Sequence, residues 1–364
     1  MLNKPKMLIF TSKTGGGHIS LSDALQDLLT QDCEVQTLDP QPAFIHWHYR
    51  TVSRHALWLW ALEFRLIDGK RRAQLAHAVA SRTLYPHIAD ALQQAQPDAV
   101  LTTYPFLTRE VTYAMHRSNR VVPFGMLFAD PNGVHHTWLT ETNAQLALAP
   151  TREVYQQART HGFNEAQLYL SGWLVRQQFL QTPPPRAETL RALGLQPERF
   201  TVFLQGGGEG AARFAATVEN VLTNPQVQVI LAAGTNQALL QRFGNTPRLA
   251  ALGFTREIAR YMAAADVVMG KAGPNMLMEA VALGKPLIAT AYIPGQEFAN
   301  LAFIRRHQLG WVALTAQAQR DLLQNLVEDE TTLAAMRVPV EAYRAWNLAC
   351  SAGVRDRVMQ LFTR

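Results

Sequence analysis

Cysteine and charge are both scarce in this chain of 364 residues. Its two cysteines, Cys33 and Cys350, are too few for a disulfide framework and lack the spacing of zinc ligands, as is typical of proteins in a reducing cytosol. Charged residues make up 17% of the chain and hydrophobic residues 48%, which excludes an intrinsically disordered protein. We therefore expect a globular protein, and the length predicts two domains with a core each.

Long apolar runs and biased tracts are also missing. No uninterrupted apolar stretch reaches the roughly 20 residues that a transmembrane helix needs. The apolar run that starts at Met7 is short and ends in a glycine-rich turn, so we interpret it as a first strand and not as a signal peptide. No internal repeat is present, and the proline run at 183–185 predicts an interdomain linker.

Strand-like and helical segments alternate through both halves of the chain. Short apolar runs predict strands near residues 7–11, 35–38, 99–103, 124–129, 145–149, 168–171, 201–204, 227–232, 267–269 and 287–289. Helices are expected from Ser20 to Leu29, over most of 42–95, and over 258–265, 319–336 and 342–362. This alternation predicts an α/β fold with two doubly wound parallel sheets, whose ligands bind at the carboxyl ends of the strands.

Three glycines and a histidine, Gly15 to His18, follow the first predicted strand. Glycines at such a turn let the backbone approach a ligand closely and present N–H groups to anionic oxygen. The turn is not a P-loop, because no Gly-Lys-Ser/Thr closes it, and it lacks the GxGxxG spacing. The simplest alternative to a functional role for His18 is a histidine that caps the following helix.

A second polar turn follows the strand predicted at 124–129. It carries Asp130 and His135 ahead of Trp138. A carboxylate and an imidazole at the carboxyl end of a strand can share a proton-relay role. The alternative is ordinary hydrogen bonding within the loop.

Residues 270–300 form a loop-helix-strand-loop pattern with polar groups at its turns. The sequence KAGP at 271–274 predicts a tight turn, and Asn275 is expected to cap a helix that ends near Leu283. The strand at 287–289 then leads into the polar sequence YIPGQE at 292–297. A helix N-terminus beside such a loop is typical of an anion site with groups for a sugar. The alternative is the ordinary strand-to-helix turn of a Rossmann-like domain.

A basic, tryptophan-rich segment lies between His46 and Arg82. It contains seven basic and two acidic residues, and three of the seven tryptophans. The apolar run at 56–62 inside it disfavours nucleic-acid binding and favours the surface of an anionic bilayer. The alternative for these apolar residues is that they cover a core.

Together these motifs resemble the GT-B glycosyltransferases. They are most similar to the monogalactosyldiacylglycerol synthases and processive diacylglycerol glucosyltransferases, with the peptidoglycan N-acetylglucosaminyltransferase as a more distant relative. The matching elements are the GGGH turn at 15–18, the KAGP turn, Glu279-Ala280, and the YIPGQE loop through Asn300. The resemblance covers nearly the whole chain and is weakest at 40–95. One residue departs from it: Met276 stands where the family has a small hydroxyl residue, which removes an expected phosphate contact.

The resemblance implies two Rossmann-like domains that face each other across a cleft. Residues 1–178 would form an acceptor- and membrane-facing domain and residues 187–345 the UDP-sugar domain, with a helix at 346–364 that can cross back. In the second domain it implies contacts to the diphosphate from the glycine-rich loop, to uracil from a backbone amide, and to ribose and sugar hydroxyls from side chains. The residues concerned are Gly207, Gly208, Glu209, Phe254, Gly273, Pro274, Asn275, Glu279, Gln296 and Glu297.

In the first domain the resemblance implies that the glycine-rich turn faces the acceptor and the reacting carbon of the sugar. His18 would then act as general base or orient the acceptor hydroxyl. Spacing leaves open which of His18, Asp130 and His135 takes the proton. The expected acceptor and membrane contacts are Gly16, Gly17, Trp58, Trp60, Arg71 and Arg72.

The sequence therefore predicts an inverting glycosyltransferase that moves a hexose from UDP-galactose or UDP-glucose to a lipid such as diacylglycerol. We expect it in the cytoplasm, peripherally bound to the anionic inner face of the cell membrane. No DxD-like pair ends a strand, so no catalytic metal and no cofactor are expected, and no nucleic-acid partner either. The alternatives are a UDP-sugar 2-epimerase and, because of Met276, an inactive UDP-sugar-binding protein. The sugar, the lipid and the oligomeric state stay open.

Overall fold

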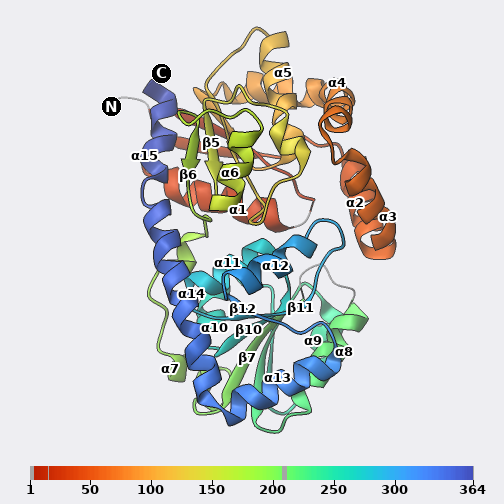
Figure 1. Ribbon diagram of the computed structural model, residues 1–364, viewed down its shortest axis with the longest axis vertical. Coiled ribbons are helices and arrows are strands. Elements are labelled where there is room, and N and C mark those ends of the chain that lie inside the picture. The colour runs from red at the N-terminus through yellow and green to blue at the C-terminus, as the bar shows by residue number, and fades with distance from the viewer. Residues whose placement is uncertain (1–3, 15, 207–210, 364) are drawn as a thin grey trace. The chain divides into compact units, whose positions relative to one another are not determined.

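The chain folds as two compact units (Figure 1). The computed structural model describes residues 4–14, 16–206 and 211–363. The first unit contains Met1–Gln177, Pro294–Gln296 and Trp346–Arg364, and the second contains Gln178–Ile293 and Glu297–Ala345. Within the described residues each unit holds one parallel six-stranded sheet. The predicted α/β fold with two doubly wound sheets is confirmed.

The sheet of the first unit has the strand order β2-β1-β3-β4-β5-β6. Its strands are β1 (Lys6–Phe10), β2 (Glu34–Leu38), β3 (Ala99–Thr102), β4 (Phe124–Leu127), β5 (Leu146–Ala149) and β6 (Leu168–Leu170). Every residue of β3, β4 and β5 is buried, because helices cover both faces of a parallel sheet. This explains why these strands are continuous apolar runs in the sequence.

The helices of the first unit include three that precede β3 without an intervening strand. The α-helices are α1 (Gly16–Leu29), α2 (Ala43–His55), α3 (Leu57–Ile67), α4 (Lys70–Ala95), α5 (Arg109–Arg117), α6 (Arg152–Thr160) and α15 (Val354–Met359). The short 3₁₀ turns are η1 (Pro105–Leu107), η2 (His136–Leu139) and η4 (Gln360–Thr363), and η3 (Gln177–Phe179) spans the division between the units.

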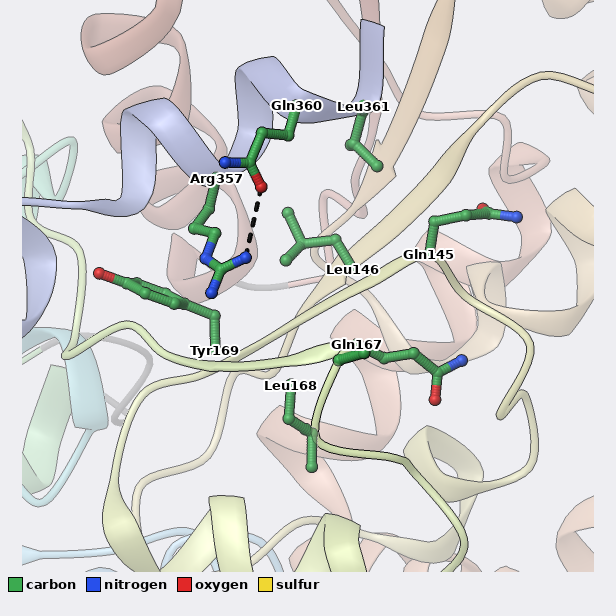
Figure 2. Close-up of a pocket in the computed structure, with 9 residues that line it drawn as sticks. Gln145, Leu146, Gln167, Leu168, Tyr169, Arg357, Gln360 and Leu361 are labelled. Carbon is green, nitrogen blue, oxygen red and sulfur yellow. Dashed lines mark hydrogen bonds between the residues drawn. The ribbon is translucent and has the colours of Figure 1, made fainter. Parts of the chain in front are cut away.

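A small hollow marks the place where α15 and η4 lie against β5 and β6 (Figure 2). The Arg357 guanidinium lies over the Tyr169 ring, 5.4 Å from its centroid, and donates to Gln360 Oε1 at 3.3 Å. Leu361 is buried at the same place. The C-terminal segment is therefore part of the first unit's core, although some 180 residues of sequence separate it from β6.

Helix α1 begins four residues earlier than the sequence predicted. Its first residue is Gly16, so His18 lies in the first helical turn and not in a loop. Glycine is a poor helix former, which is why the prediction began the helix at Ser20. Tertiary contacts override this propensity, since His18 Nδ1 lies 2.7 Å from the Thr103 carbonyl oxygen and Ser22 Oγ lies 2.9 Å from Thr103 Oγ1.

The sheet of the second unit has the strand order β12-β11-β10-β7-β8-β9. Its strands are β7 (Phe200–Gln205), β8 (Val227–Gly234), β9 (Leu249–Gly253), β10 (Val267–Lys271), β11 (Leu287–Ala291) and β12 (Gly310–Val312). The sequence did not predict β9 and β12. Both are edge strands, and β9 has no β-branched residue while β12 has only three residues.

The helices of the second unit cover both faces of its sheet. They are α7 (Arg186–Ala192), α8 (Ala211–Leu222), α9 (Gln237–Phe243), α10 (Ile258–Ala263), α11 (Pro274–Ala282), α12 (Phe298–Arg306), α13 (Ala316–Glu328) and α14 (Glu330–Ser351), the last of which continues into the first unit from Trp346. One core cluster joins β7 and β8 to α8 and α13, with Val202, Phe214 and Leu323 among its buried residues.

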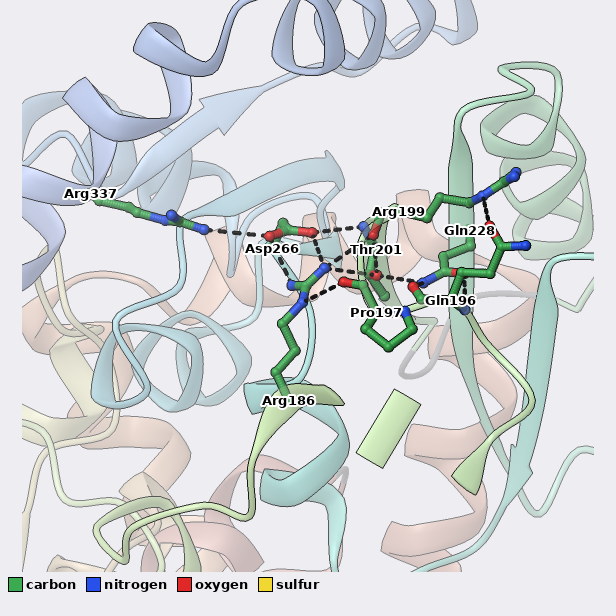
Figure 3. Close-up of polar contacts among 8 residues, drawn as sticks. All are labelled: Arg186, Gln196, Pro197, Arg199, Thr201, Gln228, Asp266 and Arg337. Carbon is green, nitrogen blue, oxygen red and sulfur yellow. Dashed lines mark hydrogen bonds and ion pairs between the residues drawn. The ribbon is translucent and has the colours of Figure 1, made fainter. Parts of the chain in front are cut away.

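A carboxylate ties three elements together at the amino end of β10 (Figure 3). Asp266 accepts two hydrogen bonds of 2.8 Å from the guanidinium of Arg186, and another of 2.8 Å from the Thr201 backbone N–H. Arg337 forms a further ion pair with it at 3.5 Å. Since the side chain of Asp266 is only 16% exposed, these charge-assisted bonds fix α7 and α14 to the start of the sheet.

Candidate functional site

Each sheet has one place where its strand order reverses, between β1 and β3 in the first unit and between β7 and β10 in the second. In open parallel sheets, ligands bind at the carboxyl ends of the strands on either side of such a place. The turns after β1 and β3, and those after β7 and β10, are therefore the candidate sites. The sequence motifs predicted a site at three of these four turns. They did not predict one at the turn after β3.

The imidazole of His18 is anchored across the reversal point of the first sheet. Its Nδ1 lies 2.7 Å from the backbone carbonyl oxygen of Thr103, the residue that follows β3. A carbonyl can only accept a hydrogen bond, so Nδ1 carries the proton and Nε2 is the basic nitrogen of the neutral ring. The ring of Tyr104 packs edge-on against it, with the centroids 4.9 Å apart. This arrangement fixes both the tautomer and the orientation of His18.

The environment of His18 also keeps the ring neutral. Burial lowers its pKa from 6.5 to about 4, against a smaller raising effect of the hydrogen bond to Thr103. At neutral pH the imidazole is therefore unprotonated and able to accept a proton at Nε2. A histidine that only capped its helix would need neither this tautomer nor this bond across the sheet.

Thr103 is a residue of this candidate site that the sequence analysis missed. It is fully buried, and its hydroxyl bonds to Thr11 Oγ1 at 3.0 Å and to Ser22 Oγ at 2.9 Å. These bonds connect the ends of β1 and β3 to α1. The contact to His18 uses a backbone carbonyl, which any residue type could supply, so the side-chain motif gave no signal for it.

His135 lies in the turn after β4 and has partners at both ring nitrogens. Its Nε2 donates to the Phe64 carbonyl at 3.0 Å, and its Nδ1 accepts from the backbone N–H of Thr137 at 3.2 Å. It is buried, and burial lowers its pKa. His135 therefore caps η2 and connects it to α3. Asp130 is half-buried in the same turn.

A buried histidine–carboxylate pair lies beneath this turn. His77 Nδ1 is 2.7 Å from Glu110 Oε1, and its Nε2 donates to the Thr137 carbonyl at 2.9 Å. Both side chains are fully buried, and burial raises the pKa of Glu110. The pair fixes α4 to α5 and η2. The sequence did not predict it, because 33 residues separate its two members.

Helices α2, α3 and α4 present large apolar side chains to the surface. None of the 11 residues of α3 is buried, although the helix has the sequence LWLWALEFRLI. The exposed large apolar residues of this segment are Phe44, Trp47, Trp58, Leu62, Leu66, Leu75 and Val79. Trp58, Leu62 and Leu66 of α3 are therefore open to solvent, while Phe64 packs against the ring of His135 with the centroids 4.4 Å apart.

The predicted membrane contacts divide between exposed and half-buried positions. Trp58 is 71% exposed and Arg71 and Arg72 are exposed, whereas Trp60 is half-buried and packs edge-on against Tyr49 at 5.2 Å. No helix in the described residues is both long enough and apolar enough to cross a membrane.

In the second unit, helix α11 starts at the reversal point between β7 and β10. Its N-cap is Gly273 and its first residue is Pro274, so the prediction that Asn275 caps the helix is wrong. Proline suits the first helical position because its fixed φ is helical and its missing N–H would have no partner there. Asn275 is therefore the second helical residue. Glu279 lies further along α11 and is only 6% exposed.

The loop after β11 is fixed by Glu297. Its carboxylate forms an ion pair with Lys271 and accepts a 2.8 Å hydrogen bond from the backbone N–H of Ile293. Glu297 is buried, while Gln296 before it is half-buried. Both carboxylate oxygens of Glu297, predicted to bind sugar hydroxyls, thus have partners within the chain.

Two glycines permit close packing at the carboxyl ends of β7 and β10. Gly270 has φ +157°, and a Cβ there would lie 2.2 Å from the Gln205 carbonyl oxygen. The same Cβ would lie 3.1 Å from the terminal methyl of Met276, so this side chain packs into the corner. At Gly206 a Cβ would collide with the ring of Phe214.

The remaining predicted donor contacts fall at the same edge of the sheet or outside the described residues. Phe254 directly follows β9, and its ring is 75% exposed. Gly207, Gly208 and Glu209 lie outside the described residues. In the part of the chain that is described, no group of three His, Cys, Asp or Glu side chains could hold a metal ion.

Two family models match successive parts of the chain. Residues 22–175 match the model described as monogalactosyldiacylglycerol (MGDG) synthase, and residues 201–337 match the glycosyltransferase family 28 C-terminal domain. The two matches include α1 from Ser22 onward, the turns after β3 and β4, and the whole of α11, while His18 lies before the first match.

Curated relatives are similar over most of the chain. The "Probable monogalactosyldiacylglycerol synthase, chloroplastic" of Nicotiana tabacum is 27% identical, over 84% of this chain and 61% of that protein. Monogalactosyldiacylglycerol synthase 1 of Arabidopsis thaliana is 26% identical over the same shares. The chain thus spans less than two thirds of the length of these relatives.

Solved structures with the GT-B fold are similar to the whole chain. Anabaena HepE in complex with UDP and glucose has a TM-score of 0.57 and 18% identity, over 98% of this chain and 99% of that one. Phytolacca americana UGT2, complexed with UDP-2fluoro-glucose and pterostilbene, has a TM-score of 0.65 and 13% identity, over 99% of this chain and 100% of that one. At these identities the likeness shows the fold, which is the GT-B fold.

Proposed function

Because the chain belongs to the monogalactosyldiacylglycerol synthase family of GT-B proteins, we propose that it transfers a hexose from a UDP-sugar to a lipid hydroxyl such as that of diacylglycerol. The observation that carries this proposal is His18, a neutral imidazole with its basic Nε2 fixed at the reversal point of the first sheet. The names of the relatives, monogalactosyldiacylglycerol synthases, favour galactose as the sugar. Glucose is the other hexose that the sequence resemblance implies.

In the proposed reaction the acceptor oxygen attacks the anomeric carbon from the side opposite the UDP. The bond from that carbon to the outer phosphate oxygen breaks, and UDP leaves with the electron pair. His18 Nε2 takes the proton of the attacking hydroxyl. The product therefore has the inverted configuration at the anomeric carbon. N–H groups at the start of α11 can stabilise the charge that develops on UDP.

The roles of the other candidate residues follow from their contacts. Thr103 is proposed to orient His18, and His135 to fix α3 against η2, since both of its ring nitrogens already have partners. Asp130 stays a candidate partner in the proton relay. Glu279 is proposed to receive the ribose hydroxyls, and the backbone at Phe254 to contact the uracil. No metal or other cofactor is proposed, so a chelator should leave the transfer rate unchanged.

We propose that the protein works at the surface of an anionic membrane in the cytoplasm. The support is α3, an apolar helix without a buried residue, next to the exposed cations Arg71 and Arg72. Apolar side chains beside arginine suit the boundary between lipid headgroups and acyl chains. No nucleic-acid partner is proposed.

The test of the proposed function is a donor experiment. The protein is incubated with diacylglycerol liposomes and with UDP-galactose or UDP-glucose labelled in the sugar. Label in the lipid extract from either donor supports transfer, and the faster donor identifies the sugar. Isomerised UDP-sugar without labelled lipid would instead indicate a 2-epimerase. Tight UDP binding with neither product would indicate an inactive binding protein, the alternative that Met276 keeps open.

A further inference from the structure

An ion pair occupies the start of α11 in the second unit. Lys271 is the last residue of β10, and its ammonium group pairs with the carboxylate of Glu297 from the loop after β11. Their side chains are only 16% and 6% exposed. A pair so shielded from water interacts more strongly than a surface pair, and it fixes the position of both groups.

The pair lies against the N-cap of the helix. A Cβ built on Gly273, the N-cap residue, would lie 3.2 Å from Lys271 Nζ and 3.7 Å from Glu297 Oε1. The positive end of a helix dipole favours an anion, and here the protein supplies that anion itself. The Glu297 carboxylate therefore lies at the end of the helix where an anionic ligand is favoured.

Each carboxylate oxygen of Glu297, expected to bind sugar hydroxyls, has a partner within the chain. One oxygen pairs with Lys271, and the other accepts the 2.8 Å hydrogen bond from the Ile293 N–H. If Glu297 moves toward a sugar, the Lys271 ammonium, only 16% exposed, loses its anion, which is costly unless another anion replaces it. A UDP-sugar brings such an anion as its diphosphate.

We propose that the Lys271–Glu297 pair is a latch that the diphosphate of the donor opens: Lys271 exchanges Glu297 for the outer phosphate, and Glu297 is released toward the sugar. This proposal rests on the proposed function, since it concerns the same donor. It makes Lys271 the residue that distinguishes a nucleoside diphosphate from a monophosphate. It also makes donor binding and the position of the 292–297 loop depend on each other.

The experiment measures the affinities of UDP and UMP by titration calorimetry. UMP lacks the outer phosphate and serves as the internal reference. Lys271→Gln should weaken UDP binding about tenfold or more, the size of one charge-assisted hydrogen bond, and leave UMP within about twofold. Lys271→Arg should recover part of the UDP preference. Glu297→Gln removes the competing anion, so UDP should bind several-fold more tightly with UMP unchanged.

Lys285→Gln is the matched control, because Lys285 follows the other end of α11. It should leave the preference for UDP over UMP at the wild-type value, and thermal unfolding of each variant checks that it folds. If Lys271→Gln and Glu297→Gln both retain the wild-type preference, the latch is wrong although the donor site stands. If the wild-type protein binds neither nucleotide, the proposed donor site and the latch are both wrong. Should Lys271→Gln fail to fold, Glu297→Gln alone decides.

Discussion

Among single residues, His18 carries the most of the proposed chemistry. The sequence indicated it through the glycines before it, and the structure adds the bond to Thr103 that fixes its tautomer. That bond could not be predicted, since it depends on where β3 ends relative to β1. The ion pair of Lys271 with Glu297 could not be predicted either, because it requires β10 and the loop after β11 to meet. Motifs thus identified side chains, while their partners depend on the fold.

Replacing His18 by alanine should lower kcat by about 100-fold or more, the usual contribution of a general base. The affinity for UDP should stay within about twofold, because the proposed donor contacts are in the second unit. Steady-state kinetics and calorimetry measure the two effects. His87→Ala, at an exposed histidine of α4, is the control and should keep wild-type kcat. Near wild-type turnover in His18→Ala would remove His18 from the mechanism.

The lowered pKa of His18 predicts an unusual pH dependence. Its base form persists down to a pKa of about 4, so kcat/KM should be level from pH 8 to about pH 5 and fall only below that. An acid limb centred near 6.5 would contradict the lowered pKa of His18.

The free energy of unfolding should also depend on the protonation of His18. Between pH 6.5 and 4 the unfolded chain binds a proton that the native ring does not, so the free energy of unfolding falls as the pH falls through this window. His18→Gln should weaken that dependence in denaturant titrations at a series of pH values. An identical pH profile for variant and wild type would argue against the pKa shift.

Among the elements, α3 departs most from the ordinary use of an apolar helix. Its sequence is as apolar as a core helix, yet none of its residues is buried. Sequence alone left two interpretations open, a membrane surface or the cover of a core, because periodicity does not tell what a face contacts. The exposure of Trp58, Leu62 and Leu66 favours the membrane surface, while Phe64 packs against His135. The start of α1 and the cap of α11 were mispredicted for a related reason, since tertiary contacts and proline geometry decided them.

Polar substitution on α3 should separate membrane binding from stability. Trp58→Ser, Leu62→Ser and Leu66→Ser combined should lower binding to anionic liposomes at least about tenfold, given the apolar area that each side chain can bury in lipid. The unfolding midpoint should change little, since these side chains are exposed. Flotation and thermal denaturation measure the two quantities. Val121→Ser, at an exposed residue outside these helices, is the control. Undiminished flotation of the triple variant would place the membrane contact elsewhere.

The carboxylate of Asp266 makes a prediction for the second unit. Asp266→Asn leaves the guanidinium of Arg186 without its bidentate partner, so the free energy of unfolding should fall by about 1–3 kcal/mol. Urea titration measures this loss. Glu219→Gln is the matched control, because Glu219 pairs with Arg242 at about half exposure and should change stability by less than about 0.5 kcal/mol. Equal effects of the two substitutions would show that the Asp266 cluster does not anchor α7.

At the scale of the whole molecule, the chain joins two doubly wound units with the proposed chemistry at the strand ends of each. The alternation of strands and helices predicted this architecture, and the likeness to GT-B structures confirms it. The edge strands β9 and β12 escaped prediction, because short edge strands carry little of the apolar signal that buried strands show. The division of labour between the units, base in one and donor in the other, is a proposal that the complete reaction must test.

The measurement that tests the proposed reaction most directly is the determination of the structure of the lipid product. The protein is incubated with UDP-galactose and diacylglycerol in anionic liposomes, and the anomeric proton of the extracted lipid is analysed by proton NMR. UDP-galactose is α-linked, so direct displacement with His18 as base predicts a β-linked galactosyl lipid that His18→Ala does not form at a comparable rate. An α-linked product would contradict it, as would a lipid extract that contains no sugar both in this experiment and in a parallel one with UDP-glucose.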